Sequence, residues 1–348
     1  MARALILGGA GVVGSAIARR LLAAGWTVDL LGRDPTRMPA DLLVAGARSI
    51  VVDRHDDAEL ARAYGTGADL LVDCLRFTAE HARQLSPFAR DAPSTVMISS
   101  KAVYVDDAGR HVNSDDAPRF RGPITEANAT LPPAAGDYTT PAGYGANKVA
   151  AEQVLLDSGA AVTVVRASKV HGVGARRPRE WHFVKRALDR RPAILLAGAG
   201  VGVDHTTAAV NLAALVHTVA DTPGRRIVNS ADPDAPTGRR IAAVVAAHLG
   251  HHWDEILLEE HVDPELGRHP WDSRPPIVLD TSAATALGYR PVGDYAATVG
   301  AEIDWLTASA VRRADRTWAL PGLERGPFCG TFDYAAENDH LASGRSPG

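Results

Sequence analysis

The chain has 348 residues, of which 46% are hydrophobic and 22% are charged, and its formal net charge at pH 7 is −4. These values predict a soluble protein with a packed core and about two domains. They disfavour a dedicated nucleic-acid-binding or membrane-surface protein. No apolar stretch approaches the ~18 residues of a membrane span. The two cysteines, Cys74 and Cys329, form no disulfide framework, so we expect a cytoplasmic protein.

The amino terminus predicts a strand, a glycine-rich turn and a helix in immediate succession. Residues 4–7 are apolar, residues 8–14 read Gly-Gly-Ala-Gly-Val-Val-Gly, and apolar residues then recur every four positions from Val13. This order is typical of a dinucleotide-binding turn. Its glycines let the backbone approach a pyrophosphate at the positive end of the helix. The residues expected to contact the cofactor are Gly8, Gly11, Val12, Val13 and Gly14.

The end of the second expected strand, residues 26–31, indicates which nicotinamide cofactor binds. NAD sites place an Asp or Glu there to hold the ribose 2′-hydroxyl, whereas NADP sites supply an Arg for the 2′-phosphate. Here Gly32 stands at that position, followed by Arg33 and Asp34, with Arg37 one turn further on. We therefore expect NADP, bound by Arg33 and Arg37. The alternative is NAD, with Asp34 on the ribose and Arg33 a solvated charge.

Strands and helices alternate beyond this point. Residues 49–53, 68–73 and 95–98 predict three more strands, residues 56–64 predict a helix, and residues 226–229 predict a strand that returns to the sheet. This order predicts an α/β fold, a Rossmann-like doubly wound parallel sheet with right-handed crossovers. Two further cofactor contacts are expected after the third strand, at Asp53, which can accept from the adenine amine, and at its neighbour Arg54.

Three residues predict an acid–base site. Ser100 follows the fifth strand, at the edge where open α/β sheets bind ligands. Tyr144 and Lys148 lie at i and i+4 of an expected helix and so share a face. The ammonium group is expected to lower the tyrosine pKa from its usual value near ~10 and to bond the nicotinamide ribose. Tyr144 can then give a proton to a carbonyl oxygen while hydride reaches its carbon.

These motifs make the chain similar to the extended branch of the short-chain dehydrogenase/reductase superfamily, the NAD-dependent epimerase/dehydratase family. The resemblance rests on the glycine turn, on Ser99-Ser100 before Val103-Tyr104, on Tyr144-x-x-x-Lys148, and on residues 165–172 and 280–291. It covers residues 3 to about 306. It implies a catalytic set of Ser100, Tyr144 and Lys148 and, as a family habit, a homodimer formed through the Tyr144 helix.

Several residues at the substrate end depart from the family pattern. Lys169 replaces an asparagine, His171 replaces a tyrosine, and Lys101-Ala102 replace the acidic pair of dehydratases. Asp204 falls near the arginine that grips the diphosphate in nucleotide-sugar enzymes, and a carboxylate there is repulsive. These departures disfavour a nucleoside-diphosphate sugar as the substrate.

We therefore expect an NADP(H)-dependent oxidoreductase that acts on a carbonyl or secondary alcohol of a small polar molecule. One alternative is a nucleotide-sugar epimerase or dehydratase with tightly bound NAD. Another is a non-catalytic cofactor-binding or RNA-associated protein. The expected partners are a small-molecule substrate and a second copy of the chain, without nucleic acid or membrane.

The second half predicts a small, discontinuous C-terminal substrate domain. Residues 1–170, with about 201–231, are assigned to the Rossmann domain, 171–200 and 232–320 to the substrate domain, and 321–348 to a frayed tail whose 328–334 stretch could dock on the body. The aperiodic segment 106–140 is expected to cover the active site.

Four features of this half predict helix caps, a basic loop and histidines at a helix end. Thr206 or Thr207 is expected to cap a helix that runs to residue 220, and Thr237 to cap the next one. The basic loop with Arg176, Arg177 and Arg179 either binds an anionic substrate group or, more commonly, is solvated. The histidines His248, His251 and His252 flank a capping glycine, so no metal site is expected.

Overall fold

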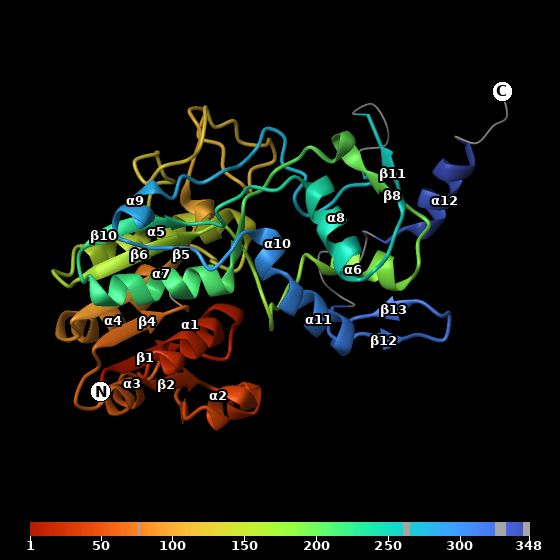
Figure 1. The fold of residues 1–348 in the computed structure, drawn as a ribbon. Coiled ribbons are helices and arrows are strands. Elements are labelled where there is room, and N and C mark those ends of the chain that lie inside the picture. Colours follow the sequence, from red (N-terminus) through yellow and green to blue (C-terminus); the bar gives the residue numbers. More distant parts are fainter. Residues whose placement is uncertain (76, 260–264, 324–331, 344–348) are drawn as a thin grey trace.

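A computed structural model describes residues 1–75, 77–259, 265–323 and 332–343. Figure 1 shows a sheet lobe that holds the amino terminus and a second lobe that holds the described C-terminal end. Phe328 and Cys329 lie outside the described residues, but Phe332 packs against the apolar core of the second lobe and the Tyr334 hydroxyl donates to Asp189 at 2.7 Å, so the described end of the 328–334 stretch docks as expected.

The sheet lobe is built on seven strands in the order β10-β6-β5-β4-β1-β2-β3. Every neighbouring pair is parallel, which confirms the doubly wound α/β prediction and the return of the 226–229 strand. The order reverses between β1 and β4, and ligands bind at such a switch point, beyond the carboxyl ends of the strands. The strands are β1 (Arg3–Leu7), β2 (Thr27–Gly32), β3 (Arg48–Val51), β4 (Leu70–Asp73), β5 (Ser94–Ser100), β6 (Val162–Ala167) and β10 (Arg226–Ser230).

Alternating side chains of the strands build a core on each face of this sheet. Ala4 and Ile6 of β1 pack with α1 and α7 on one face, and Leu5 and Leu7 pack with α3, α4 and α5 on the other. The covering helices are α1 (Val12–Ala23), α3 (Asp57–Tyr64), α4 (Ala79–Asp91), α5 (Pro141–Leu156) and α7 (Ala209–Asp221), and the short α2 (Ala40–Val44) follows β2.

Helix α4 has no counterpart among the sequence predictions. It contains Pro87, and a proline inside a helix removes a hydrogen bond and normally argues against a helix. Thr78 begins the helix by accepting a hydrogen bond from the backbone N–H of His81. The buried face with Ala82, Leu85 and Ala89 holds it against the sheet, so tertiary packing outweighs the local preference.

The second lobe has its own apolar core, in which Phe183, Trp271, Tyr295 and Ile303 are fully buried or nearly so. Thr237 caps α8 by accepting from Arg240 N, as expected. The elements of this lobe and of its junction with the sheet are β7 (Lys169–His171), α6 (Trp181–Leu188), β8 (Ala193–Leu196), β9 (Thr206–Ala208), α8 (Gly238–His248), β11 (Asp254–Leu257), α9 (Ser282–Ala286), α10 (Tyr295–Thr298), α11 (Gly300–Ser309), β12 (Val311–Arg312), β13 (Trp318–Ala319) and α12 (Tyr334–Ser343).

Two expectations for this half are wrong. Thr206 and Thr207 lie in β9 rather than at a helix N-terminus, and α7 begins after Ala208 without a side-chain cap. The frayed tail is also wrong for residues 334–343, which form α12. Glu337 of this helix is buried and forms ion pairs with Arg186 and Arg191.

No helix within the described ranges is both long and apolar enough to cross a membrane.

Candidate active site

The glycine turn between β1 and α1 needs glycine at its close contacts. Gly8 has a φ of +87°, a conformation that side chains rarely adopt. A Cβ on Gly14 would come within 2.4 Å of the Gly8 carbonyl oxygen, and one on Gly9 within 2.7 Å of the Leu30 side chain. At Gly11 the closest atom to such a Cβ is the Gly8 oxygen at 3.4 Å. Gly14 and Gly9 therefore allow tight packing, whereas Gly11 keeps open space at the start of α1.

The start of α1 fits an anionic ligand. Gly11 is the N-cap residue, no side chain caps the helix, and its first turn has no acidic residue. The N–H groups that begin with Val12 and Val13 therefore meet no protein carboxylate, and the positive end of the helix dipole adds to their attraction for a phosphate. The residues present fit the pyrophosphate of a dinucleotide.

At the end of β2, two arginines are more available to a cofactor than the Asp34 carboxylate is. The Asp34 carboxylate accepts from the backbone N–H and the hydroxyl of Thr36, at 3.0 and 2.6 Å, and so caps the short turn over Pro35–Arg37. Hydrogen bonding to Thr36 lowers the Asp34 pKa. Arg33 and Arg37 are exposed. These partners leave Asp34 less suited to a ribose hydroxyl than the arginines are to a phosphate.

Asp53 and Arg54 follow β3. Asp53 is exposed and accepts from the backbone N–H of His55 at 3.1 Å. Arg54 turns towards the loop after β4, where it donates to the carbonyl oxygen of Leu75 and lies 5.8 Å from the centre of the Phe77 ring. Arg54 thus supports this loop, and Asp53 stays open to a ligand.

Ser100 and Tyr144 come together at the carboxyl end of β5. The Ser100 side chain lies close enough to the Tyr144 phenol to lower its pKa. The Ser99 hydroxyl is used elsewhere, donating to buried Glu152. Thr140 caps α5 by accepting from Gly143 N at 3.1 Å, which holds the first turn that carries Tyr144. Burial raises the Tyr144 pKa, and the proximity of Ser100 opposes the rise.

Lys148 lies one turn further along α5 and is 2% exposed. Its ammonium group donates to the Ile98 carbonyl oxygen at 2.9 Å and lies 4.5 Å from the centre of the Phe77 ring. Burial lowers the Lys148 pKa to about 8, against the attraction of the Asp73 carboxylate. Lys148 is not among the groups that shift the Tyr144 pKa, so the expected lowering of that pKa by Lys148 is wrong in this structure.

Phe77 and Tyr138 are site residues that the sequence analysis missed. Their rings stack at 5.3 Å with an interplanar angle of 8°, and Phe77 also lies 6.2 Å from the Tyr144 ring. Phe77 comes shortly after β4, so the rule that ligands bind beyond strand ends could have found it. Tyr138 belongs to segment 106–140, and its contact brings the end of that segment to the site.

Three of the residues that depart from the family pattern, Lys101, Lys169 and Asp204, form a buried ion network. Asp204 pairs with Lys101, which directly follows Ser100, and lies 2.8 Å from the Lys169 ammonium. Burial and the nearby Arg179 lower the Lys169 pKa to about 7, against the attraction of the Glu180 carboxylate. Asp204 is therefore compensated by two lysines, which corrects the view of it as a lone repulsive carboxylate.

A hollow of about 500 Å³ reaches Asp204 from outside. It lies between residues 112–118 of the long segment and residues 268–277, and Arg268, Ser273 and Arg274 line it. Its position next to the ion network makes it the candidate substrate pocket.

The arginines of the basic loop and two of the histidines named in the sequence analysis differ in their surroundings. Arg176 and Arg177 are exposed, whereas Arg179 is half-buried and donates to the Val170 carbonyl oxygen at 3.3 Å. His248 pairs with Asp304, and His251 bonds the Arg191 carbonyl oxygen.

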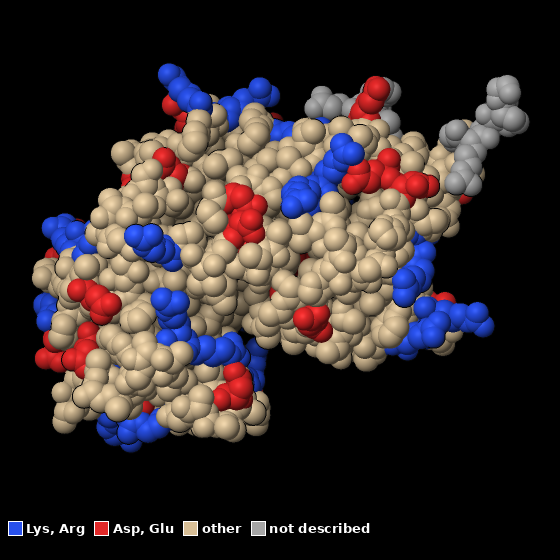
Figure 2. All heavy atoms as spheres, viewed as in Figure 1, with Lys and Arg blue, Asp and Glu red and all other residues tan. Residues whose placement is uncertain are grey.

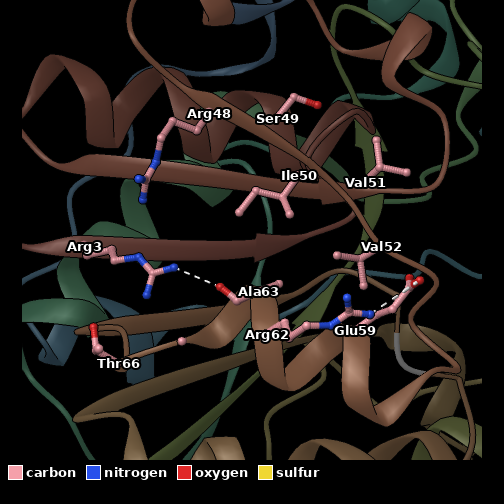
Figure 3. A pocket seen from close by; sticks show the side chains of 11 residues that line it. Arg3, Arg48, Ser49, Ile50, Val51, Val52, Glu59, Arg62, Ala63 and Thr66 are labelled. Carbon is pink, nitrogen blue, oxygen red and sulfur yellow. Dashed lines mark hydrogen bonds and ion pairs between the residues drawn. The ribbon is translucent and has the colours of Figure 1, made fainter.

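A larger hollow of about 800 Å³ lies at the far edge of the sheet, away from these residues (Figure 3). Its arginines already have protein partners: Arg3 and Arg48 both pair with buried Asp29, and Arg62 pairs with Glu59. This hollow is therefore a groove beside the edge strand β3 whose charged groups are already paired. The face seen in Figure 2 carries both signs of charge, intermixed.

The doubly wound sheet and its glycine turn place the protein in the class of Rossmann-type nucleotide-binding folds. The sequence profile of the NAD dependent epimerase/dehydratase family matches residues 4–229, well over half of the chain. The chain belongs to this family.

Solved structures share the fold. DesIV, a dTDP-glucose 4,6-dehydratase from Streptomyces venezuelae with NAD and TYD bound, is 21% identical with a TM-score of 0.64, covering 88% of this chain and 97% of that one. The Thermus thermophilus UDP-glucose 4-epimerase in complex with NAD is 18% identical with a TM-score of 0.63, covering 87% and 98%. MoeE5 in complex with UDP-glucose and NAD is 18% identical with a TM-score of 0.63, covering 88% and 99%. A search of curated proteins returns no match.

Proposed function

We propose that the protein is an NADP(H)-dependent oxidoreductase that acts on a carbonyl or secondary-alcohol carbon of a small polar molecule. The observation that carries the proposal is the proximity of the Tyr144 phenol to the Ser100 side chain, beyond the end of β5 and one helical turn from Lys148. The nicotinamide cofactor, when bound, supplies or accepts the hydride.

In the reducing direction, Tyr144 donates its phenolic proton to the carbonyl oxygen, and Ser100 hydrogen-bonds the same oxygen. The raised Tyr144 pKa keeps the phenol protonated at physiological pH, so a proton is available to donate, but it also makes the phenol a weaker acid than one whose pKa lies near the working pH. Lys148 would hold the nicotinamide ribose. This role requires Phe77 to move off the ammonium group that it covers.

The preference for NADP is supported by the end of β2, where Arg33 is exposed and Asp34 is engaged by Thr36. We expect R33A to weaken NADPH binding by about 10–100-fold, the value of a charge-assisted hydrogen bond of about 1.5–3 kcal/mol, and to leave NADH binding nearly unchanged. D34N is the matched variant and should affect neither cofactor strongly. Fluorescence titration of both variants with both cofactors checks this, and a loss of NADH binding in D34N would favour NAD.

The proposed substrate carries a polar, anionic group. Arg268 and Arg274 line the candidate pocket together with Asp115 and Asp272. Lys101 and Lys169 pair with Asp204 at its buried end, so positively charged groups are available there to an anionic group. A carboxylate or phosphate on a small molecule would be attracted there.

The proposal is tested by NADPH oxidation with a panel of small aldehydes and ketones, with and without a carboxylate or phosphate group. We expect turnover with anionic members of the panel. If NADPH binds but no member of the panel is reduced, the reductase proposal fails.

The second candidate is a nucleotide-sugar epimerase or dehydratase, favoured by the NAD-bound structures that share the fold. It predicts that the purified protein retains NAD and converts a nucleotide sugar without added cofactor. A non-catalytic cofactor-binding or RNA-associated protein predicts cofactor binding with neither reaction.

A further inference from the structure

The junction of the two lobes contains a cluster of ionisable side chains that the proposed chemistry does not use. His171 ends β7, Glu180 directly precedes α6, and Glu302 lies in α11. One ligand atom of each lies within 4.8 Å of the others. The exposed fractions are 2% for His171, 2% for Glu180 and 1% for Glu302.

The His171 ring is oriented by a buried carboxylate. Its Nε2 lies 3.0 Å from Asp232, whose carboxylate also accepts from Thr206 Oγ1, Ala208 N and Asn211 Nδ2 at 2.7–2.8 Å. These donors favour the ionised form of Asp232, so Nε2 carries the ring proton and Nδ1 presents a lone pair. That Nδ1 atom is buried and has no hydrogen-bond partner. A carboxylate on one ring nitrogen and a free lone pair on the other is the arrangement of a histidine metal ligand.

The two glutamates place their charge beside this lone pair. Glu302 Oε2 accepts from Gly172 N at 2.5 Å and lies 3.8 Å from His171 Nδ1, while Glu302 Oε1, as a carboxylate oxygen, has no partner. Glu180 accepts a long hydrogen bond of 3.5 Å from the Tyr295 hydroxyl. Buried carboxylates with so few donors are costly unless something compensates them.

Arg179 does not compensate them fully. It lies near enough to attract Glu302 electrostatically, but within the described part of the chain it forms no ion pair with Glu180 or Glu302. Its NH1 atom donates to the Val170 carbonyl oxygen. Arg179 thus attracts Glu180 and Glu302, and Lys169 attracts Glu180, but among the described residues neither cation forms an ion pair with these carboxylates.

A shared proton between Glu180 and Glu302 would relieve the two carboxylates but would leave the His171 lone pair buried without a partner. A protonated His171 would form ion pairs with Asp232 at 3.0 Å and Glu302 at 3.8 Å, but the second distance is too long for a hydrogen bond, so Nδ1 would still lack an acceptor at this separation. A divalent cation would use all three groups at once.

We propose that His171 Nδ1 and the carboxylates of Glu180 and Glu302 bind a divalent first-row transition-metal ion, for which Zn²⁺ is the probe. One imidazole and two carboxylates form a mixed nitrogen and oxygen set, and three protein ligands leave a position for water. Ligand atoms around tetrahedral zinc lie about 3.4 Å apart, so the three side chains must draw slightly together on binding.

Solvent reaches the cluster through a hollow of about 600 Å³ between α1, α7 and α11, lined by His171, Gly172 and Glu302. Figure 2 shows the surface notched between the two lobes, where Figure 1 places α1 opposite α11. An ion bound there would join β7, α6 and α11 and so stabilise the junction of the lobes.

The test is calorimetric titration of the full-length, chelator-dialysed protein with Zn²⁺, combined with thermal unfolding. We expect one zinc ion per chain and a rise in the unfolding temperature. E302Q retains the size of the side chain and an acceptor for Gly172, and should weaken zinc binding at least tenfold. D304N is the control, since Asp304 is an exposed carboxylate on the same helix, and should bind zinc like the wild type.

Equal zinc binding by E302Q and the wild type would overturn the proposal, because the ion would then bind elsewhere. An absence of zinc binding, with E302Q more stable than the wild type, would overturn it in favour of a shared proton. Anomalous scattering from zinc-soaked wild-type crystals needs no variant. A peak beside His171 Nδ1 supports the site, and a peak only elsewhere overturns it.

Discussion

At the scale of the residue, Tyr144 shows that surroundings set acidity more strongly than helical spacing does. The i, i+4 spacing placed Lys148 on the same face, and we expected its ammonium group to lower the tyrosine pKa. Instead that group donates to Ile98 O and is covered by Phe77, and burial raises the Tyr144 pKa. The phenol therefore keeps its proton at neutral pH, and its acidity in this structure is weaker than the helical spacing predicted.

The proposed role of Tyr144 as proton donor predicts the effect of Y144F, which removes the phenolic hydroxyl and retains the ring. We expect turnover to fall about 10²–10⁴-fold, the usual contribution of a general acid, with cofactor affinity nearly unchanged. Steady-state kinetics and cofactor titration measure the two effects separately. Y138F, which alters a phenol of the adjacent stacked ring, is the control. Wild-type turnover in Y144F would remove Tyr144 from the mechanism.

At the scale of the element, different glycines of the turn serve packing and ligand binding. We expect G14A to lose about 1–3 kcal/mol of stability, because its Cβ would press on the Gly8 carbonyl oxygen at 2.4 Å. G11A meets only a 3.4 Å contact and should cost at most about 1 kcal/mol, yet its methyl group enters the space for the pyrophosphate.

Chemical denaturation and cofactor titration of both glycine variants check this contrast. G11A should retain its unfolding midpoint and lose cofactor affinity. If G11A binds cofactor as tightly as the wild type, the turn does not hold the pyrophosphate in the proposed way.

Helix α12 shows that a segment with little hydrophobic pattern can dock through charge. Glu337 is 5% exposed, and its carboxylate oxygens lie 2.6 Å from Arg186 and 3.1 Å from Arg191. We expect E337A to cost about 3–5 kcal/mol, because it leaves buried guanidinium groups without their partner. D339A, at an exposed position of the same helix, should be neutral. Urea denaturation of both variants is the measurement, and equal midpoints would mean that α12 does not dock.

At the scale of the whole molecule, stability should depend on pH through buried Lys148. Its pKa is about 8 in the folded protein and about 10.4 in an unfolded chain. Between these values the unfolded state binds more protons, so this lysine makes stability rise with pH over that window. Below about pH 8 the penalty for the buried charge is fully present.

The measurement is urea unfolding of the wild type and K148M at pH 7 and pH 10. We expect the stability of the wild type relative to K148M to increase by up to about 3 kcal/mol between these pH values. A difference that stays constant, or that shrinks as pH rises, would contradict the lowered pKa.

The fold was predictable because its signals are local. Apolar runs identified strands of the parallel sheet, because a strand that is buried on both faces requires such a run. The glycine turn marked the end of the first strand, and residues 226–229 were recognised as a further strand. Helix α4 was missed because Pro87 weakens its local pattern, and β9 was read as a helix cap because a threonine suits both. In each case packing with distant residues decided the outcome.

The candidate site was predictable only in part. Ser100, Tyr144 and Lys148 lie in motifs with short spacing, whereas Phe77, Tyr138 and the Lys101–Asp204–Lys169 network join residues far apart in the chain. The proposed metal ligands are similarly dispersed, so no spacing in the sequence indicated them.

The sequence by itself determined the family, the sheet and the glycine turn, because hydrophobic periodicity and glycine conformation act over a few residues. Only the tertiary structure decided which charges are compensated, as at Asp204 and Glu337, and which lone pair is left buried, as at His171. The physical reason is that the free-energy cost of a buried charge depends on partner residues in other elements. These partners lie far away along the chain, so the sequence spacing does not indicate which residues meet.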